Sequence, residues 1–348
     1  MMTKQIPNHA ETVLVTGGSG FVASWCLVEL LRRGFTVRTT VRSLSKEQAV
    51  RAAISTVIDP RDRLTFFAAD LTSDVGWAEA VAGCDYVLHV ASPLGRDNPK
   101  NPDELIVPAR DGALRVLRAA TNAGVKRVVI TSACAAASPS SYSENRVTDE
   151  SLWTDPEDNT LNPYRKSKTL AELAAWQFMK EEHDGPTTLT TILPGAVFGP
   201  VLAADTVGSV QVIGRLLQGR FPAVPRLGFE VVDVRDLVDV HIRAMMSTQA
   251  AGERFIAVGE FMWMTDIAKT LRSKLGIPAS KVPARTMPDF VFRLLALFEP
   301  GLRSVMPGLG RKHRHTPEKA QRILGWRPRP AEETLIDCAK SLMAHHVV

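Results

Sequence analysis

A glycine-rich turn between an apolar strand and an apolar helix constrains this chain more than any other feature. Residues 13–15, Val-Leu-Val, have the length and branching of a buried parallel strand. Residues 17–20, Gly-Gly-Ser-Gly, follow, and the apolar positions of residues 21–31 recur at helical spacing. Gly34 stands where a glycine ends a helix, and a β-rich run, residues 35–41, comes next. The sequence therefore predicts a strand–turn–helix–strand unit whose helix begins at the glycines.

The spacing of the turn is Gly17-x-x-Gly20-x-x-Ala23, a variant of the dinucleotide fingerprint in which alanine replaces the last glycine. In such a unit the backbone N–H groups and the helix dipole bind a pyrophosphate, which glycines allow to approach the backbone. Glycine clusters also serve ordinary turns. The strand before and the helix after favour the dinucleotide site.

Basic residues at the end of the second strand indicate which dinucleotide is bound. Units that bind NAD usually carry an Asp or Glu there, on the ribose hydroxyls, whereas Arg accommodates the 2′-phosphate of NADP. Here the strand ends at Arg42, with Arg38 before it and Lys46 after it and no acidic residue between them. A guanidinium grips phosphate with two hydrogen bonds. A solvated basic strand end is the alternative, and we predict NADP(H).

Composition and charge exclude several other classes of protein. The 348 residues are 45% hydrophobic and 23% charged, with a net charge of +5 spread along the chain, so nucleic acid is not the expected partner. The four cysteines show neither close pairing nor metal-ligand spacing, which favours reduced thiols and no metal site. No apolar run approaches the ~20 residues that span a bilayer. Residues 290–298 are interrupted by Arg293 and predict an amphipathic helix. We expect a cytoplasmic protein without membrane contact.

Strands and helices continue to alternate after the first unit. This rhythm predicts an α/β fold with a doubly wound parallel sheet, the Rossmann architecture, whose ligands bind at the carboxyl ends of the strands. The irregular segment 139–163 is expected to be an active-site loop. Residues 231–240 predict a strand and helix that return to the sheet. We assign residues 1–193, with 228–258 returning, to the dinucleotide domain, and 194–227 with 259–348 to a smaller C-terminal substrate-binding lobe.

The chemistry is expected at Tyr164, which precedes Lys168 by four residues on a predicted helix. That spacing puts both side chains on one helix face. A nearby ammonium stabilises a phenolate and lowers the tyrosine pKa, so Tyr164 can donate a proton to a carbonyl oxygen that receives a hydride. The Tyr-x-x-x-Lys pattern also occurs by chance, but the upstream fingerprint favours the catalytic interpretation.

The chain resembles the extended short-chain dehydrogenases/reductases, and within them the group of dihydroflavonol reductases, cinnamoyl-CoA reductases and carbonyl (aldehyde) reductases. The matching pieces follow the family order over most of the chain. They are TGGSGFVASW (16–25), TVRTTVR (36–42), AADL (68–71), HVASP (89–93), VVITS (128–132), NPYRKSKTLAE (162–172), LPGAVFGP (193–200) and VVDVRDLVDVH (231–241).

The resemblance implies a role for each matching residue. Three residues would be catalytic. Tyr164 would donate the proton, Lys168 would lower the pKa of Tyr164 and hold the nicotinamide ribose, and a serine would complete the set. The cofactor-binding residues would be Gly17, Gly20, Phe21 and Val22 at the pyrophosphate, Arg42 and Lys46 at the 2′-phosphate, Asp70 and Leu71 at the adenine, Val90, Ala91 and Ser92 at the middle of the cofactor, and Pro194, Gly195 and Val197 at the carboxamide. A homodimer through the long helices is also implied.

The chain departs from the family at the catalytic serine. The family usually has Ser-Ser at the end of the fifth strand, whereas this chain has Ser132-Ala133, so Ala133 occupies the catalytic position. Neighbouring strand residues point to opposite faces, which argues against Ser132, although a bulge would re-aim it. We nominate Ser132 as the replacement. Loss of such a donor costs about 100-fold or more in other enzymes.

These residues predict an NADPH-dependent reductase of an aldehyde or ketone. The alternatives within the fold are a hydroxysteroid-type dehydrogenase and a nucleotide-sugar epimerase or dehydratase; Arg42 and the HVASP segment argue against the latter two. The alternative that is not an enzyme is a non-catalytic NADP-sensing protein. Tyr164 and Lys168 argue against it, and Ala133 argues for it.

His313 and His315 resemble a metal pair, but a solvated basic surface is the expected interpretation.

Overall fold

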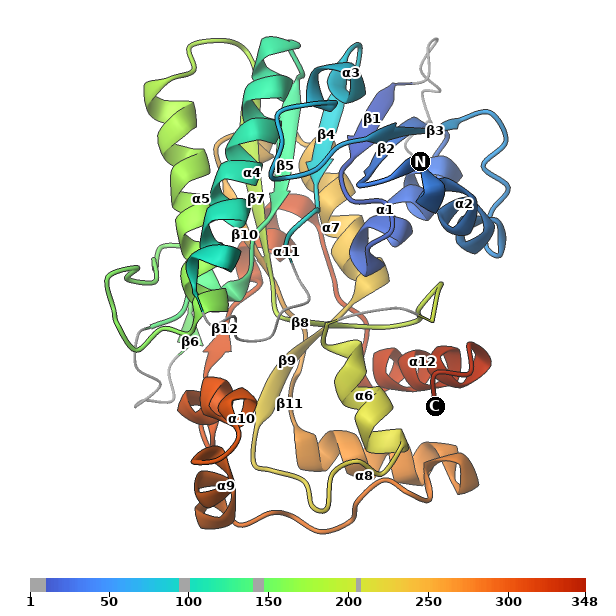
Figure 1. Ribbon diagram of the computed structural model, residues 1–348, viewed down its shortest axis with the longest axis vertical. Helices are drawn as coiled ribbons and strands as arrows, with labels where there is room; N and C mark the ends of the chain where they lie inside the picture. The colour runs from blue at the N-terminus through green and yellow to red at the C-terminus, as the bar shows by residue number, and fades with distance from the viewer. Residues whose placement is uncertain (1–10, 94–100, 140–146, 205–207) are drawn as a thin grey trace.

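The computed structural model describes residues 11–93, 101–139, 147–204 and 208–348. Its centre is a seven-stranded parallel sheet with the strand order β10-β7-β5-β4-β1-β2-β3 (Figure 1). The strands are β1 (Thr12–Val15), β2 (Thr36–Val41), β3 (Leu64–Ala68), β4 (Tyr86–His89), β5 (Arg127–Thr131), β7 (Thr188–Pro194) and β10 (Arg254–Ala257). The predicted doubly wound fold is confirmed. Part of the predicted active-site segment, residues 140–146, lies outside the described residues.

Helices cover both faces of this sheet, which explains why its strands are apolar along their length. One face carries α3 (Trp77–Val81), α4 (Asp103–Asn122) and α5 (Pro163–Glu181), and the other carries α1 (Phe21–Arg32), α7 (Val234–Met246) and α11 (Glu318–Leu324), with α2 (Glu47–Ser55) beside α1 (Figure 1). Val13, Leu14 and Val15 on the central strand are fully buried. The strand order reverses at β1, so a crevice forms at the carboxyl ends of β1 and β4, where α/β sheets bind ligands.

Local sequence signals set the helix ends. Gly34 ends α1 at a φ of 93°, a left-handed conformation that favours glycine, and its N–H donates to the carbonyl of Leu31. At the start of α5, the Asn162 side chain accepts from the N–H of Arg165 at 2.8 Å, and Pro163 occupies the first turn. These caps fix the first turn of the helix that carries Tyr164.

A smaller lobe extends below the main sheet in Figure 1. It contains the three-stranded sheet β8 (Ala196–Phe198), β9 (Gly228–Asp233) and β11 (Phe261–Trp263), with α6 (Val210–Leu217), α8 (Met264–Leu275), α9 (Asp289–Ala296), α10 (Pro300–Val305) and α12 (Ala331–Ala344). A separate apolar cluster that includes Phe198, Ile213, Leu271 and Leu335 forms its core. β6 (Val147–Thr148) and β12 (Arg314–His315) form a two-stranded ribbon.

One element of the predicted topology is wrong. The strand within residues 231–240 was expected to return to the main sheet, but β9 pairs with β8 and β11 in the lobe. From residues 228–258, α7 and β10 pack with the main sheet, where β10 pairs with β7. The sequence could not distinguish these pairings, because strand partners are set by tertiary packing. The division of the chain into two domains stays a prediction.

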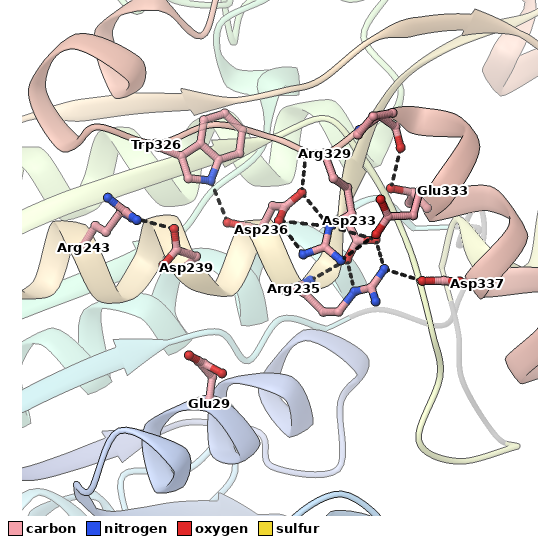
Figure 2. A network of polar contacts seen from close by, with 12 residues as sticks. Glu29, Asp233, Arg235, Asp236, Asp239, Arg243, Trp326, Arg329, Glu333 and Asp337 are labelled. Atoms are coloured by element: carbon pink, nitrogen blue, oxygen red, sulfur yellow. Dashed lines mark hydrogen bonds and ion pairs between the residues drawn. The ribbon is translucent and has the colours of Figure 1, made fainter.

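Partly buried ion pairs join the two parts of the molecule after β9 (Figure 2). Asp233 caps α7 by accepting the N–H of Arg235 at 2.8 Å and also pairs with its guanidinium. Arg235 reaches Asp337 on α12 at 2.8 Å, and Arg329 binds Asp236 at 2.8 Å. The network ties α7 of the main sheet to α12 of the lobe, and so fixes the relative position of the two walls of the crevice.

Candidate active site

All the residues predicted for the site line one cleft of about 1350 Å³ between the main sheet and the lobe. They are Gly17, Gly20, Phe21, Val22, Arg42, Lys46, Asp70, Leu71, Val90, Ala91, Ser92, Ser132, Tyr164, Lys168, Pro194, Gly195 and Val197. Most come from the carboxyl ends of β1, β2, β3, β4, β5 and β7, and the others from the starts of α1 and α5 and from β8. The fold thus brings together groups that are up to 180 residues apart.

The glycine turn is held tightly against β2. Gly17 has a φ of 73°, and a Cβ on Gly18 would lie 2.3 Å from Oγ1 of Thr39. The N–H of Gly17 donates to Oγ1 of Thr40 at 3.0 Å, and the N–H of Gly18 donates to the Thr40 carbonyl at 2.8 Å. Thr39 and Thr40 therefore hold the turn so close to β2 that it has no room for a side chain at Gly18. α1 then begins after Gly20, with its N–H groups directed at the cleft.

Thr16 fixes the loop after β4, a role that the sequence did not indicate. Its hydroxyl oxygen accepts the N–H groups of Val90 and Ala91 at 3.0 and 2.9 Å. The same hydroxyl lies 2.9 Å from Nδ1 of His89. Burial lowers the pKa of His89 to about 3. His89 is therefore neutral and adds no charge to this wall of the cleft.

The residues at the adenine end suit a phosphorylated ribose. Arg42 and Lys46 line the cleft and are exposed. Asp70, the one acidic residue expected here, turns to Thr72, whose N–H and hydroxyl both donate to it, and this lowers the pKa of Asp70. The carboxylate is thus engaged by its own turn. The glycine cradle, the helix N-terminus and the two exposed cations fit NADP(H) as the bound group.

Tyr164 and Lys168 lie at the floor of the cleft, on the first turns of α5. Although 39% of Tyr164 is exposed, the surrounding protein desolvates its hydroxyl and, with a contribution from Cys134, raises its pKa to about 12. Lys168 is buried, donates to the Thr131 carbonyl at 3.2 Å, and has a pKa lowered by burial to about 8. The tyrosine pKa therefore differs from the lowered value that the sequence predicted, because desolvation dominates.

The hydroxyl of Ser132 is directed into the core, in contrast to its nomination as the catalytic donor. It donates to the Glu172 carboxylate at 2.6 Å, and Ser132 is 4% exposed. Glu172 also pairs with Arg254 at 2.8 Å. Ala133, 5% exposed, lines the cleft beside it. The Ser132 hydroxyl is directed away from the cleft because side chains alternate between the two faces of a strand. β5 keeps its regular pairing with β7 to its end, without a bulge that would re-aim Ser132.

A polar cluster on the opposite wall was missed by the sequence analysis. His315, 7% exposed, contacts Glu230 through Nδ1 at 2.5 Å and Oγ of Ser138 through Nε2 at 3.0 Å. The expected solvated histidine surface is therefore wrong: both His313 and His315 are buried cleft-lining residues. Cys134, Glu230 and His315 each place one potential ligand atom within 4.8 Å of the others. The predicted lack of a metal stays a prediction.

No local signal marked this cluster, because its members come from distant elements. Ser138 follows the turn after β5, Glu230 lies on β9 and His315 lies on β12. The ribbon that β12 forms with β6 and the pairing of β9 within the lobe bring them together. Such contacts depend on tertiary structure alone.

Comparison with known proteins agrees with this geometry. Residues 13–259 match the family described as the NAD dependent epimerase/dehydratase family. An anthocyanidin reductase ((2S)-flavan-3-ol-forming) of Vitis vinifera is 33% identical over 299 residues, which cover 81% of this chain and 86% of the relative. The cinnamoyl-CoA reductase CAD2 of Medicago truncatula is 34% identical over 287 residues, which cover 81% and 86%.

Solved structures show the same architecture. Gre2 from Candida albicans in complex with NADPH superimposes with a TM-score of 0.79 at 25% identity, over 97% of this chain and 99% of that one. The yeast methylglyoxal/isovaleraldehyde reductase Gre2, also complexed with NADPH, has a TM-score of 0.79 at 24% identity over 96% and 99%, a likeness of fold. The chain described here belongs to the NAD dependent epimerase/dehydratase family, and the resemblance to extended short-chain dehydrogenases/reductases is confirmed.

Proposed function

We propose that the protein is an NADPH-dependent reductase that converts an aldehyde or ketone to an alcohol. The observation that carries the proposal is the meeting of three groups in one cleft: the glycine turn, the cations Arg42 and Lys46, and the Tyr164–Lys168 pair. The relatives named above as reductases, and the Gre2 structures that hold NADPH, support an NADP-dependent oxidoreductase.

The residues of the chain divide the work of the reaction. When bound, NADPH supplies a hydride for the carbonyl carbon. Tyr164 supplies the proton that the carbonyl oxygen takes up as the alcohol forms. Its pKa of about 12 keeps that proton on the hydroxyl at neutral pH, as an acid requires. Lys168, with a pKa of about 8, is largely charged at neutral pH and stabilises the phenolate that the transfer leaves.

A specific observation favours a second candidate, an NADP-sensing protein without catalysis. The family serine is replaced by Ala133, and the hydroxyl of Ser132 is directed at Glu172. A sensor would need the glycine turn and Arg42 but neither Tyr164 nor Lys168. The presence of this pair in the cleft supports the reductase as the first choice.

The test is the loss of reduced-nicotinamide absorbance with NADPH and NADH separately, over a panel of aldehydes, α-keto esters, aryl ketones and dihydroflavonols. We expect turnover with NADPH that falls by about 100-fold or more in Tyr164→Phe, since general acid catalysis contributes that much. Tyr86→Phe is the matched control, because Tyr86 is buried outside the cleft with its hydroxyl near Glu11. Tight NADPH binding without turnover on any substrate would favour the sensor.

The cofactor preference has its own variant. Arg42→Ala should raise the KM for NADPH by about tenfold or more and leave that for NADH unchanged, because one charged contact to phosphate is lost. Arg32→Ala, an exposed arginine on α1 that pairs with Glu29, is the control. A wild-type preference for NADH would contradict the assignment of Arg42.

A further inference from the structure

α9 has apolar residues on two faces, only one of which is packed against the protein. On the packed face Phe292 and Ala296 are 2% and 3% exposed. Phe292 forms a small cluster with Met287 and Leu309. This cluster holds α9 to the lower edge of the lobe, with α10 between α9 and β12 (Figure 1). The other face has no cover among the described residues.

That second face carries large apolar side chains in solvent. Phe290, Leu294, Leu297 and Phe298 are 72%, 56%, 62% and 77% exposed. Leu294, Leu297 and Phe298 follow Phe290 by four, seven and eight residues, a spacing that puts all four on one side of a helix. Leu297 and Phe298 continue the helical turn, since their N–H groups donate to the carbonyls of Leu294 and Leu295. We call these four residues the α9 face. Exposed apolar patches of this kind mark interaction sites.

The α9 face lies within a basic stretch of the chain. Residues 281–314 hold seven basic side chains and only two acidic ones, Asp289 and Glu299, so this segment alone has a net charge of +5, equal to that of the whole protein. All seven are exposed: Lys281, Arg285, Arg293, Arg303, Arg311, Lys312 and Arg314. Asp289 is already paired with Arg226. Two of these cations are next to the α9 face itself: Arg293 is on α9, and Arg303 donates to the Ala296 carbonyl at the end of the helix. Their charge favours an anionic partner.

In contrast to the expectation of no membrane contact, we propose that the α9 face docks onto an anionic lipid membrane. A short amphipathic helix with Phe and Leu on one side and Lys and Arg around it is the kind of element that lies in the lipid interface. Basic residues next to it are attracted to the negative surface potential of anionic lipids. The contact is peripheral, because no helix among the residues described is long and apolar enough to cross a bilayer.

Charge also decides against a second copy of the chain. A symmetric dimer brings the same patch of both protomers together. Here that would bring two segments of net charge +5 into contact, and like charges within a Debye length repel. An anionic bilayer has the opposite sign and accommodates apolar side chains. A bilayer of this kind therefore suits both the apolar side chains of the α9 face and the positive charge of its segment.

Docking would also bring the mouth of the cleft to the lipid. Arg303, Val305 and Pro307, which follow the α9 face in the chain, line the cleft. Val305 is itself 41% exposed. An apolar carbonyl compound dissolved in the bilayer would then enter the cleft from the membrane side. This consequence depends on the proposed reductase function, whereas the docking itself does not.

The experiment is co-sedimentation of the full-length protein with phosphatidylcholine vesicles, with and without phosphatidylglycerol. We expect binding only to the anionic vesicles, which decreases as salt is added. Phe290→Ser combined with Phe298→Ser should weaken the binding by about tenfold or more, because two buried aromatic side chains are lost from the interface. Val75→Ser is the control, since Val75 is 78% exposed but lies far away, just before α3.

Charge variants separate the two contributions. Arg285→Glu with Arg293→Glu should weaken vesicle binding, and Lys340→Glu, an exposed lysine on α12, should not. Circular dichroism melting of each variant shows that it is folded, independent of any NADPH turnover. Failure of the wild type to bind anionic vesicles overturns the proposal. A dimer in analytical ultracentrifugation that the Phe variants dissociate, without vesicle binding, would assign the α9 face to a second copy instead.

Discussion

Oγ of Ser132 lies 2.6 Å from Oε2 of Glu172, within the core behind the cleft. Glu172 also accepts from the Thr191 hydroxyl at 2.7 Å and from the Arg254 guanidinium at 2.8 Å. Arg254 in turn stacks on the Trp153 ring at 3.5 Å from its centroid. Ser132 is thus one of several groups that satisfy a buried carboxylate, which is the condition for burying a charge.

We therefore expect Ser132→Ala to reduce stability and to leave kcat unchanged. The variant removes one donor from a buried carboxylate, which costs about 1–3 kcal/mol of unfolding free energy. Urea unfolding and NADPH turnover measure the two effects. Thr191→Val removes another donor from the same carboxylate and should behave alike. A fall in kcat in Ser132→Ala without a loss of stability would restore Ser132 as the catalytic donor.

A hydroxyl at position 133 should increase the activity. Ala133 lines the cleft, at the position that the resemblance assigns to the family serine, so we expect Ala133→Ser to add a donor near the reacting carbonyl. We expect kcat to rise by up to about 100-fold, the typical contribution of one such donor. Ala135→Ser, which also adds a hydroxyl to a cleft-lining residue, is the control. Equal kcat values for both variants and the wild type would show that the protein polarises its substrate by other groups.

The buried amine of Lys168 should make stability depend on pH. Its pKa is about 8 in the folded protein against its usual 10.5, because burial disfavours the charge. Both states carry the proton below pH 8, where the burial penalty is fully present. Between about pH 8 and 10.5 only the unfolded chain keeps it, so unfolding free energy rises with pH by about 3 kcal/mol.

Lys168→Met isolates this effect, because other groups titrate alike in both proteins. We expect the unfolding free energy of the wild type, relative to the variant, to increase when urea unfolding is repeated from about pH 7.5 to about pH 10. A difference that stays constant over this range would show that Lys168 is fully charged in the folded protein.

The network in Figure 2 should support the junction between α7 and α12. Arg329→Met leaves Asp236, which is 8% exposed, without its guanidinium partner, and we expect a loss of about 3 kcal/mol. Arg33→Met breaks the surface pairs with Glu29 and Asp239 and should cost at most about 1 kcal/mol. Comparable losses in the two variants, measured by urea unfolding, would contradict a special role for the junction.

The elements that recur locally were predictable from the sequence. The glycine turn, the alternation of strands and helices, the Asn162-Pro163 start of α5 and the Tyr164–Lys168 spacing each depend on neighbours in the chain. Their predicted placement in one cleft follows from a rule of parallel sheets, in which the carboxyl ends of the strands share one edge. The pKa of Tyr164 was predicted in the wrong direction, because desolvation depends on everything packed around it.

The sequence by itself thus determined the family, the doubly wound sheet and the residues around the cleft, because these depend on backbone propensity and short-range spacing. The tertiary structure alone decided the partner of β9, the direction of the Ser132 hydroxyl, and the meeting of Ser138, Glu230 and His315. It also decided that one face of α9 stays in solvent. The physical reason is the same in each case: pairing, burial and charge are properties of groups that are distant in the chain.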